Sequence, residues 1–355
     1  MARGKAEPDR PDAPRPGRPP RTRRILSLTG LGLALLLLVT AAAGTVLYAR
    51  LDGNIRTDDA AARALAADHA SRPRALAPKA QNILLLGSDL ETVKDSERSD
   101  TTILLHLSAD RRSAAAVSVP RDLMVNIPSC LRPDGSRSRA QYAQFNWAFQ
   151  FGGAACAIRT FEGFTGIRVD HHMVVSFTGF EKVIDAVGGV EVDVTEPVRE
   201  PEFGVTLLPG HQLVKGKEAL TFVRTRVGVS DGSDLQRIER QKQFVRSLYG
   251  KLRDAGTLSS PTRLWPLLDA ATSALTADPG LESPGELFAL MSSAGRIPAD
   301  RVRIVTLPCV EDPDRWGNYQ MVRGEGEALL KALREDRPLP DHLYNAYRPD
   351  GRPKT

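Results

Sequence analysis

Arginines gather in one stretch of the chain, Thr221–Gln241, which reads TFVRTRVGVSDGSDLQRIERQ. The segment LTFVRTR at its start predicts a strand, in which alternate side chains share a face, so Phe222, Arg224 and Arg226 would lie together. A buried charge is costly unless it meets an opposite charge. The pattern therefore favours an anionic partner against this face.

A capped helix is predicted after these arginines. Ser233 or Asp234 can cap a helix that begins near Leu235. Its apolar residues recur at helical spacing: Leu235, Ile238, Val245, Leu248, Tyr249 and Leu252. At about 100° per residue, Arg237 and Gln241 fall beside this inward stripe with Asp234. The outer side carries Glu239, Arg240, Gln243 and Arg246.

Three arginines, Arg224, Arg226 and Arg237, are thus predicted to point inward near a helix N-terminus. A helix N-terminus attracts anions, and the planar fork of arginine matches phosphate oxygens. The sequence favours a phosphate site here over the alternative, a structural network of salt bridges with nearby acids.

Further polar residues follow short apolar runs earlier in the chain. The runs QNILLLGSD, TTILLHL and AAAVSVPRD predict buried strands beginning at Gln81, Thr101 and Ala114. The loops at their ends carry Asp89, Arg98, Asp100 and Arg121. Because ligands of open α/β sheets bind at such strand ends, these residues are predicted to share a site with the arginines of Thr221–Gln241.

The N-terminal part of the chain predicts a membrane anchor. Residues 1–24 carry eight Lys/Arg against three acids and are proline-rich, which predicts a disordered basic tail. Residues 25–49 carry no charge and would span about 37 Å as a helix, more than a bilayer core of about 30 Å. A retained span is favoured over a cleaved signal peptide because the apolar run is long. The basic flank predicts a cytoplasmic N-terminus and an exported remainder.

The rest of the chain divides by composition. Residues 50–80 predict a short helix and tether, residues 81–336 an extracytoplasmic catalytic domain, and residues 337–355 a loose tail. Helices are expected over 261–275 and 286–294, and a strand over 302–307. The formal charge of +5 is concentrated in the N-terminal tail, so no nucleic-acid partner is predicted.

Two of the three cysteines predict a disulfide. Cys130 and Cys156 flank a loop of 25 residues, and an exported domain lies in an oxidising compartment. Closing a loop of that size would contribute about 3 kcal/mol of stability. Cys309 is expected to be a buried small side chain.

Six segments in order, NILLLGSD, ERSDTT, SVPRD, FEKVIDAVGGVEVDV, LVKGKEALTFVRTR and GSDLQRIERQ, resemble the LytR–CpsA–Psr family of membrane-anchored bacterial envelope enzymes. The resemblance is strong over residues 81–251. It implies an α/β fold, a mixed central sheet flanked by helices and preceded by one transmembrane helix. It also implies an Mg²⁺-dependent phosphotransferase that moves a cell-wall glycopolymer from a polyprenyl-pyrophosphate carrier onto peptidoglycan.

The resemblance also implies roles for single residues. Asp89 and Asp100 would hold Mg²⁺, and Asp234 would hold arginines in place. The pyrophosphate would contact Arg98, Arg121, Arg224, Arg226, Arg237 and Gln241, while the lipid tail would lie in an apolar pocket. Where the family often has Lys-Ile-Asn, this chain has Gln144-Phe145-Asn146. Arg137 or Arg139 could supply the missing basic contact.

Phosphoryl transfer needs neutralised phosphate oxygens and an aligned nucleophile, here a sugar hydroxyl of the glycan. Asp89, Asp100 and Asp122 are the candidates for taking its proton, and the pair His171-His172 is a less favoured one. The same residues would serve a hydrolase of polyprenyl pyrophosphate, which stays an alternative. A non-catalytic envelope-binding or regulatory protein is less favoured, because a tail of 24 residues cannot form a cytoplasmic domain.

Overall fold

The computed structural model describes residues 21–88, 99–201, 203–225, 234–254, 261–340 and 342–345. The chain divides into two compact units, which are Met1–Arg50 and Leu51–Thr355. Most of the predicted basic tail lies outside the described residues.

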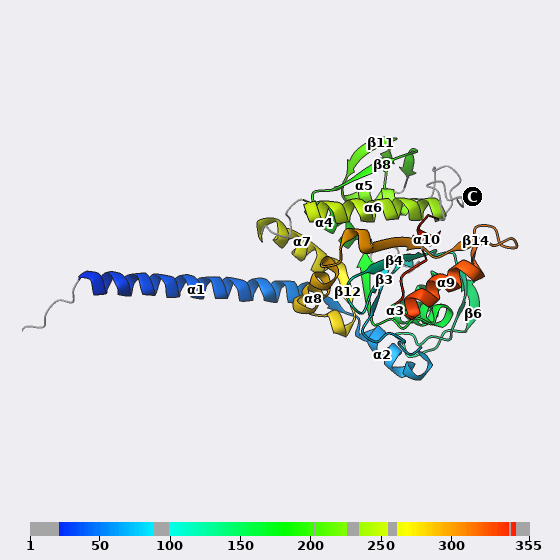
Figure 1. The fold of residues 1–355 in the computed structure, drawn as a ribbon, viewed down its shortest axis with the longest axis horizontal. Coiled ribbons are helices and arrows are strands. Elements are labelled where there is room, and N and C mark those ends of the chain that lie inside the picture. The colour runs from blue at the N-terminus through cyan, green and yellow to red at the C-terminus, as the bar shows by residue number, and fades with distance from the viewer. Residues whose placement is uncertain are drawn as a thin grey trace, which may run out of the picture. The chain divides into compact units, whose positions relative to one another are not determined.

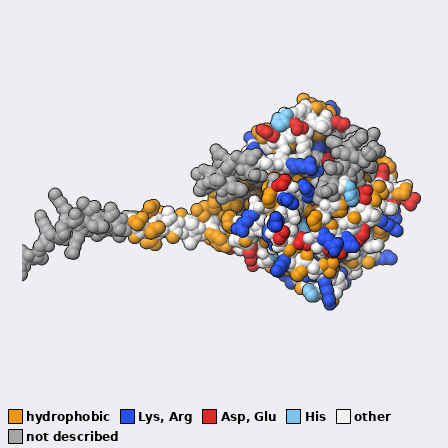
Figure 2. Space-filling model, in the orientation of Figure 1, with side chains coloured by type: hydrophobic (Ala, Val, Ile, Leu, Met, Phe, Trp, Pro, Cys, Tyr) orange, Lys and Arg blue, Asp and Glu red, His pale blue; other side chains and the backbone are white. Residues whose placement is uncertain are grey.

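The first unit consists, in its described part, of helix α1 (Arg21–Asn54), which continues into the second unit (Figure 1). It covers the uncharged run predicted to span a membrane. Its residues Leu33–Asn54 are apolar and long enough to cross a membrane, and the described side chains are mainly hydrophobic (Figure 2). The helix fits a single-pass membrane anchor.

A mixed sheet of seven strands organises the second unit. In order across the sheet these are β1 (Arg56–Thr57), β12 (Leu275–Ala277), β7 (His171–Ser176), β2 (Gln81–Ser88), β3 (Ser99–Leu107), β4 (Ala114–Val119) and β13 (Val302–Thr306). The three apolar runs predicted as strands form β2, β3 and β4, and the expected strand over 302–307 forms β13. The α/β fold class is confirmed.

Helices cover both faces of this sheet (Figure 1). One face carries α2 (Asp59–Ala67), α3 (Trp147–Thr165) and α9 (Arg323–Arg334). The other face carries α4 (Phe177–Ala186), α5 (Gly216–Arg224), α6 (Asp234–Asp254) and α8 (Pro284–Gly295), and α7 (Pro261–Ala274) packs against α4. Neighbouring residues of a strand point to opposite faces. Leu84 therefore joins the core with α3 and α9, whereas Ile83 joins the core with α8.

Short hairpins complete the domain. Strand β8 (Val190–Val194) pairs with β11 (Gly210–Val214), and β9 (Val198–Glu200) pairs with β10 (Val205–Leu207). These hairpins share a second core with α4–α6 around the buried rings of Phe222 and Phe244. The turn into β8 uses Gly189 at a positive φ of 90°, where a Cβ atom would lie 2.9 Å from the Val214 carbonyl oxygen.

The remaining elements are β5 (Met124–Ile127) paired with β6 (Gln141–Gln144), β14 (Cys309–Glu311) paired with β15 (Tyr319–Met321), the 3₁₀ turns His69–Ser71, Pro279–Leu281 and Ala299–Arg301, and α10 (His342–Asn345). Leu339 and Leu343 are buried in the main core. This part of the predicted loose tail is therefore packed onto the domain.

The strand prediction for LTFVRTR was wrong, because this segment forms the end of helix α5. Residues Ala219, Leu220, Thr221 and Phe222 are all buried in one helical turn. The alternation of β-branched and charged residues imitates a strand, but packing of Phe222 into the second core overrides that local preference. Phe222 and Arg224 consequently do not share a strand face, and Arg226 lies outside the described residues.

The segment expected to act as a tether packs onto the domain instead. Its strand β1 pairs with β12, and Leu51 is buried. In helix α2, Ala61, Ala64 and Leu65 are buried in the main core. The small side chains of this alanine-rich helix allow close contact with α3, so the domain begins well before Gln81.

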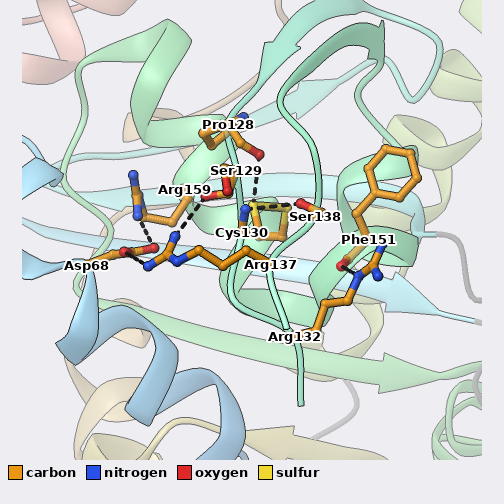
Figure 3. Close-up of a disulfide and its surroundings, with 10 residues drawn as sticks. Asp68, Pro128, Ser129, Cys130, Arg132, Arg137, Ser138, Phe151 and Arg159 are labelled. Carbon is orange, nitrogen blue, oxygen red and sulfur yellow. Dashed lines mark hydrogen bonds and ion pairs between the residues drawn. A yellow bond between two sulfur atoms is a disulfide. The ribbon is translucent and has the colours of Figure 1, made fainter. Parts of the chain in front are cut away.

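The predicted disulfide joins Cys130, in the loop after β5, to Cys156 in α3, with 5.4 Å between their Cα atoms. Figure 3 shows the disulfide beside an ion pair that ties the same loop to the end of α2, in which Arg137 Nη2 lies 2.6 Å from Asp68 Oδ1. Arg159 of α3 also pairs with Asp68. Cys309 is buried, as expected.

Candidate functional site

The polar segments singled out by the sequence lie together at one end of the central strands, which we call the sheet edge. Ser88 at the end of β2 pairs with Ser99 at the start of β3 and with Ser176 at the end of β7. Val119 at the end of β4 pairs with Thr102. The loops that follow β2, β4 and β7 and the loop that precedes β3 therefore leave the sheet at the same edge.

A β-bulge marks this edge between β2 and β3. Gly87 pairs with Thr101, but the next residue, Ser88, pairs with Ser99, so Asp100 is the extra residue of the bulge. Bulges often occur beside active sites, where they change the direction of a side chain. Asp89, Arg98 and the side chain of Asp100 lie outside what the structure describes.

The strand ends at the bulge offer donors that suit a magnesium ion. Ser88 is fully buried, and its Oγ atom has no hydrogen-bond partner among the described residues. The chain continues directly from Ser88 into Asp89, and from its pairing partner Ser99 into Asp100. Mg²⁺ takes oxygen ligands and is usually held by one or two carboxylates together with waters and phosphates, so the chemistry of this donor set fits the ion.

Beside this edge, α4, α5 and α6 enclose a pocket of about 190 Å³ against β2, β3 and β7. Most of its lining is apolar: Leu85, Leu86, Ile103, Val175, Phe177, Phe180, Leu220, Val223, Phe244 and Val245. Gly87 and Thr101 reach it from the bulge, and Arg224, Arg237 and Gln241 reach it from the helices. An apolar chamber with a few convergent polar groups is the usual form of a small-molecule site.

Helix α6 places Arg237 and Gln241 on its inner side, as the helical spacing predicted. Arg237 is only 2% exposed and Gln241 9%. Gln241 Nε2 donates to the Val223 carbonyl oxygen at 3.0 Å and to Thr101 Oγ1 at 3.3 Å. The two residues are four apart and share one face, so α6 brings a cation and an amide to the pocket together.

Arg224 reaches the pocket from the last turn of α5. Its guanidinium carbon lies 4.8 Å from the centre of the Phe177 ring and 5.5 Å from that of Phe203. Cation–π contacts of this kind orient a guanidinium group without neutralising its charge. The arrangement positions a half-buried positive charge next to apolar rings.

Arg121 lies at the same sheet edge but is not among the residues that line the pocket. Its Nε atom is 3.6 Å from Asp122 Oδ2, and both side chains are largely buried. The Asn146 amide donates to the Arg121 carbonyl at 3.0 Å, and Gln144 Nε2 donates to Asp122 Oδ1 at 3.1 Å. Gln144, at the departure from the family motif, thus supports the Arg121 loop.

Of the two arginines considered as substitutes for a basic contact, Arg137 is engaged elsewhere. It bonds to Asp68 and donates to the Ser129 carbonyl at 3.2 Å, beside the disulfide (Figure 3). Arg139 is exposed. The structure therefore brings together Arg224, Arg237 and Gln241. Arg226 lies outside the described residues, as does the side chain of Asp234.

Arg240 contributes to this region but was assigned to the outer side of its helix. Its Nε atom donates to the Phe222 carbonyl at 2.9 Å, and Nη2 donates to the Thr225 carbonyl. Burial lowers the pKa of Arg240 to about 10, against an opposing effect of Glu196, so it stays charged at neutral pH. It neutralises the negative C-terminal end of α5. The strand predicted for LTFVRTR has no such end, so that prediction gave no inward role to Arg240.

The histidine pair lies away from this edge. His171 begins β7 and Ser176 ends it, a separation of about 17 Å along a strand. His171 Nδ1 is 3.1 Å from Asp278 Oδ1, and this hydrogen bond raises the pKa of His171. His172 Nε2 is 3.3 Å from Asp58 Oδ2. The two histidines therefore connect β7 to the segments that carry Asp278 and Asp58, and we assign them a structural role.

The family model for the LytR_cpsA_psr family matches residues 48–336. The chain belongs to this family. Among its relatives, "Cell wall biosynthesis protein LcpA" of Corynebacterium glutamicum is 32% identical over 242 residues, covering 64% of this chain and 46% of the relative. TagT of Bacillus subtilis, "Polyisoprenyl-teichoic acid--peptidoglycan teichoic acid transferase", is 32% identical over 188 residues, covering 50% and 54%. The chain spans about half the length of these two relatives.

The fold of LytR_cpsA_psr proteins is also recognisable among solved structures. A structure titled "TagT bound to LI-WTA" superposes with a TM-score of 0.56 at 26% identity, covering 72% of this chain and 90% of that one. The six segments that suggested the family in the sequence thus indicated both family and fold correctly.

Proposed function

We propose that this LytR_cpsA_psr protein is a phosphotransferase that moves a cell-wall glycopolymer from a polyprenyl-pyrophosphate carrier onto peptidoglycan and releases polyprenyl phosphate. The observation that carries the proposal is the mixed lining of the pocket. Arg224, Arg237 and Gln241 share it with ten apolar side chains. A ligand that complements this lining has an anionic head and an alkyl tail, as a polyprenyl pyrophosphate has.

The relatives support this choice of substrates. TagT of Bacillus subtilis is named for a polyisoprenyl-linked donor and a peptidoglycan acceptor, and LcpA of Corynebacterium glutamicum is named for cell-wall biosynthesis. The polyisoprenyl-linked donor in the name of TagT agrees with the amphiphilic pocket and with an anchor that keeps the domain near a lipid substrate.

Each residue has a distinct part in the proposed reaction. Arg224 and Arg237, with Arg98, Arg121 and Arg226, neutralise the phosphate oxygens, which gain charge as the transition state forms. Asp89 and Asp100 would hold Mg²⁺, which supplies further neutralisation of the pyrophosphate when bound. Gln241 donates to a phosphate oxygen in place of its longer hydrogen bond to Thr101 Oγ1, and Asp234 orients arginines.

The bonds that change are those at one phosphorus atom. A sugar hydroxyl oxygen of the acceptor bonds to the phosphorus next to the glycopolymer, and the bond from this phosphorus to the bridging oxygen breaks. Polyprenyl phosphate leaves with the bridging oxygen. The hydroxyl proton passes to one of the carboxylates at the sheet edge, Asp89, Asp100 or Asp122.

The deciding experiment supplies full-length protein with a lipid-linked oligosaccharide and Mg²⁺, with and without peptidoglycan glycan strands. Oligosaccharide joined to the strands by a phosphodiester supports the transferase. Release of free oligosaccharide phosphate regardless of acceptor would identify a hydrolase instead. Arg237→Ala should abolish either reaction, whereas Arg246→Ala, an exposed position of the same helix, is the matched control.

We also propose that the protein is a single-pass membrane protein with a cytoplasmic N-terminus and an extracytoplasmic catalytic domain. The uncharged run in α1 and its basic flank support this orientation. Protease added outside intact spheroplasts should digest the domain and spare residues 1–24. Protection of the domain would contradict the exported orientation.

A further inference from the structure

A tryptophan in the turn between β14 and β15 projects almost entirely into solvent. Trp316 is 91% exposed, in the hairpin that extends from the domain beside α9 (Figure 1). A large apolar side chain contributes little to folding when it stays in water. Surface loops often carry binding residues, and exposed apolar side chains indicate recognition when they form a patch.

The turn that carries Trp316 is held in one conformation by its own hydrogen bonds. The amide of Asp312 donates to the Asn318 carbonyl at 2.8 Å, and the amide of Asn318 donates to the Arg315 carbonyl at 3.0 Å. The amide of Gly317 donates to Glu311 Oε1 at 3.3 Å. A pre-ordered loop loses little entropy when it binds a partner, so the exposed indole is presented ready for contact.

The hairpin is joined to the loop of the candidate site. Gln144 Nε2 donates to Asn318 Oδ1 at 2.9 Å and to Asp122 Oδ1 at 3.1 Å. The Tyr319 amide donates to the Asp122 carbonyl at 3.1 Å. Asp122 is adjacent to Arg121 in the chain, so the base of the hairpin adjoins the loop that carries Arg121.

A second aromatic ring and a cation lie at the same hairpin. Tyr142 on β6 is 47% exposed, and the guanidinium carbon of Arg315 lies 5.3 Å from the centre of its ring. Arg315 precedes Trp316, so it connects the hairpin to Tyr142. We call Tyr142, Arg315 and Trp316 the hairpin patch.

We propose that the hairpin patch binds the glycan strand of the acceptor and so guides its sugar hydroxyl to the phosphate. A pyranose ring has a face of C–H groups that packs on the electron-rich face of an aromatic ring. Guanidinium N–H groups donate to hydroxyl, carbonyl and carboxylate oxygens, which edge the sugars and peptides of peptidoglycan. The inference rests on the proposed transferase, because it names the place where that enzyme holds its acceptor.

A membrane surface is another partner that exposed tryptophans contact, but the hairpin lies across the sheet from β1, the strand that follows the anchor helix in the chain. The end of α1 leads into β1, which is the outermost strand on one side of the seven-stranded sheet. β13, which precedes the hairpin, is the outermost strand on the other side. Six spacings of about 4.8 Å place these two outermost strands about 29 Å apart. The position favours an acceptor in the wall over a lipid headgroup.

The test uses the full chain in lipid nanodiscs and uncrosslinked peptidoglycan glycan strands as the probe. Trp316→Ala should weaken strand binding about tenfold, the effect expected for losing one aromatic face, and Trp316→Phe should restore most of it. Phe288→Ala, which removes another exposed ring from α8, should bind strands like the wild type. In a transfer assay, Trp316→Ala should raise the KM for strands and leave the KM for the lipid-linked donor unchanged.

Equal strand binding by wild type, Trp316→Ala and Phe288→Ala would overturn the inference while leaving a measured transferase intact. Strong quenching of Trp316 fluorescence by brominated lipids, absent in Trp316→Phe, would also overturn it, because the indole would then lie in the bilayer. If the wild type binds strands through Trp316 but transfers nothing, the glycan site stands and the proposed reaction fails.

Discussion

Replacement of Arg224 tests whether its guanidinium group serves the reaction or the fold. The side chain contacts the rings of Phe177 and Phe203 at 4.8 and 5.5 Å. Arg224→Ala removes two cation–π contacts of about 0.5–1 kcal/mol each, so the loss of unfolding free energy should be about 1–2 kcal/mol. The melting temperature should fall by only a few degrees.

The expected effect on the reaction is larger. A donor aimed at developing charge contributes about 10²–10³ in rate, or about 2.7–4 kcal/mol. Arg224→Ala should therefore lower kcat/KM for the lipid-linked donor by at least about 10²-fold in protein that is still folded. Arg224→Lys keeps the charge and much of the ring contact but cannot form the bidentate fork. It should melt close to the wild type and still transfer poorly.

Melting and initial rates should be measured on the same samples of wild type, Arg224→Ala, Arg224→Lys and the control Arg246→Ala. The structural alternative makes the opposite forecast, in which stability falls first and any folded protein stays active. Near-normal turnover by folded Arg224→Ala would refute the phosphate-binding role.

Three further predictions concern the metal, the disulfide and pH. Asp100→Ala should raise the Mg²⁺ concentration needed for half-maximal transfer, and excess Mg²⁺ should restore part of the rate; an unchanged Mg²⁺ dependence would remove Asp100 from the metal site. Cys130→Ser with Cys156→Ser should lower the unfolding free energy by about 3 kcal/mol, measured by denaturant titration, and peptide mapping of the wild type without reductant should recover the two cysteines linked. The pair of His171 and Asp278 should stabilise the fold only while both are charged. Its hydrogen bond raises the pKa of His171 above 6.5, so this contribution is complete below pH 6.5 and is lost as pH rises through the raised pKa. Burial acts to raise the pKa of Asp278, but hydrogen bonds from His171 and the His172 amide lower it below 3.8, so the contribution is also lost as pH falls through that lowered value. The difference in unfolding free energy between wild type and Asp278→Asn, followed against pH, should show this window, and a flat difference would contradict it.

The parts of the fold that the sequence predicted are those with a strong period or a long apolar run. β2 and β3 are buried on both faces, so their side chains form continuous apolar runs. Helical spacing over several turns of α6 correctly predicted that the side chains of Arg237 and Gln241 point inward. These signals are local, and distant contacts do not alter them.

The parts that were missed depend on contacts between distant segments. Helix α5 is fixed by the packing of Phe222 against Phe244 and β8, which no local pattern reveals. The role of Arg240 follows only from the position of the α5 carbonyls. Likewise, the packing of residues 51–67 depends on β12, more than two hundred residues later in the chain. Without that partner, the alanine-rich and charged composition of the segment predicts only a tether.

The order of the strands in the sheet has a consequence for export. β1 and β7 are separated by β12, and β4 is covered by β13, although β12 and β13 are the last of the seven strands to be made. In the proposed export, strands up to β7 can assemble while the chain crosses the membrane, but the outer sides of β4 and β7 stay open until residues 275–306 have emerged. Open strand edges pair readily with other chains. A chain that stops after α6 would thus retain the pocket residues and still be liable to aggregate. The residues after α6 therefore protect the sheet from pairing with other chains, although the described ones add nothing to the lining of the pocket.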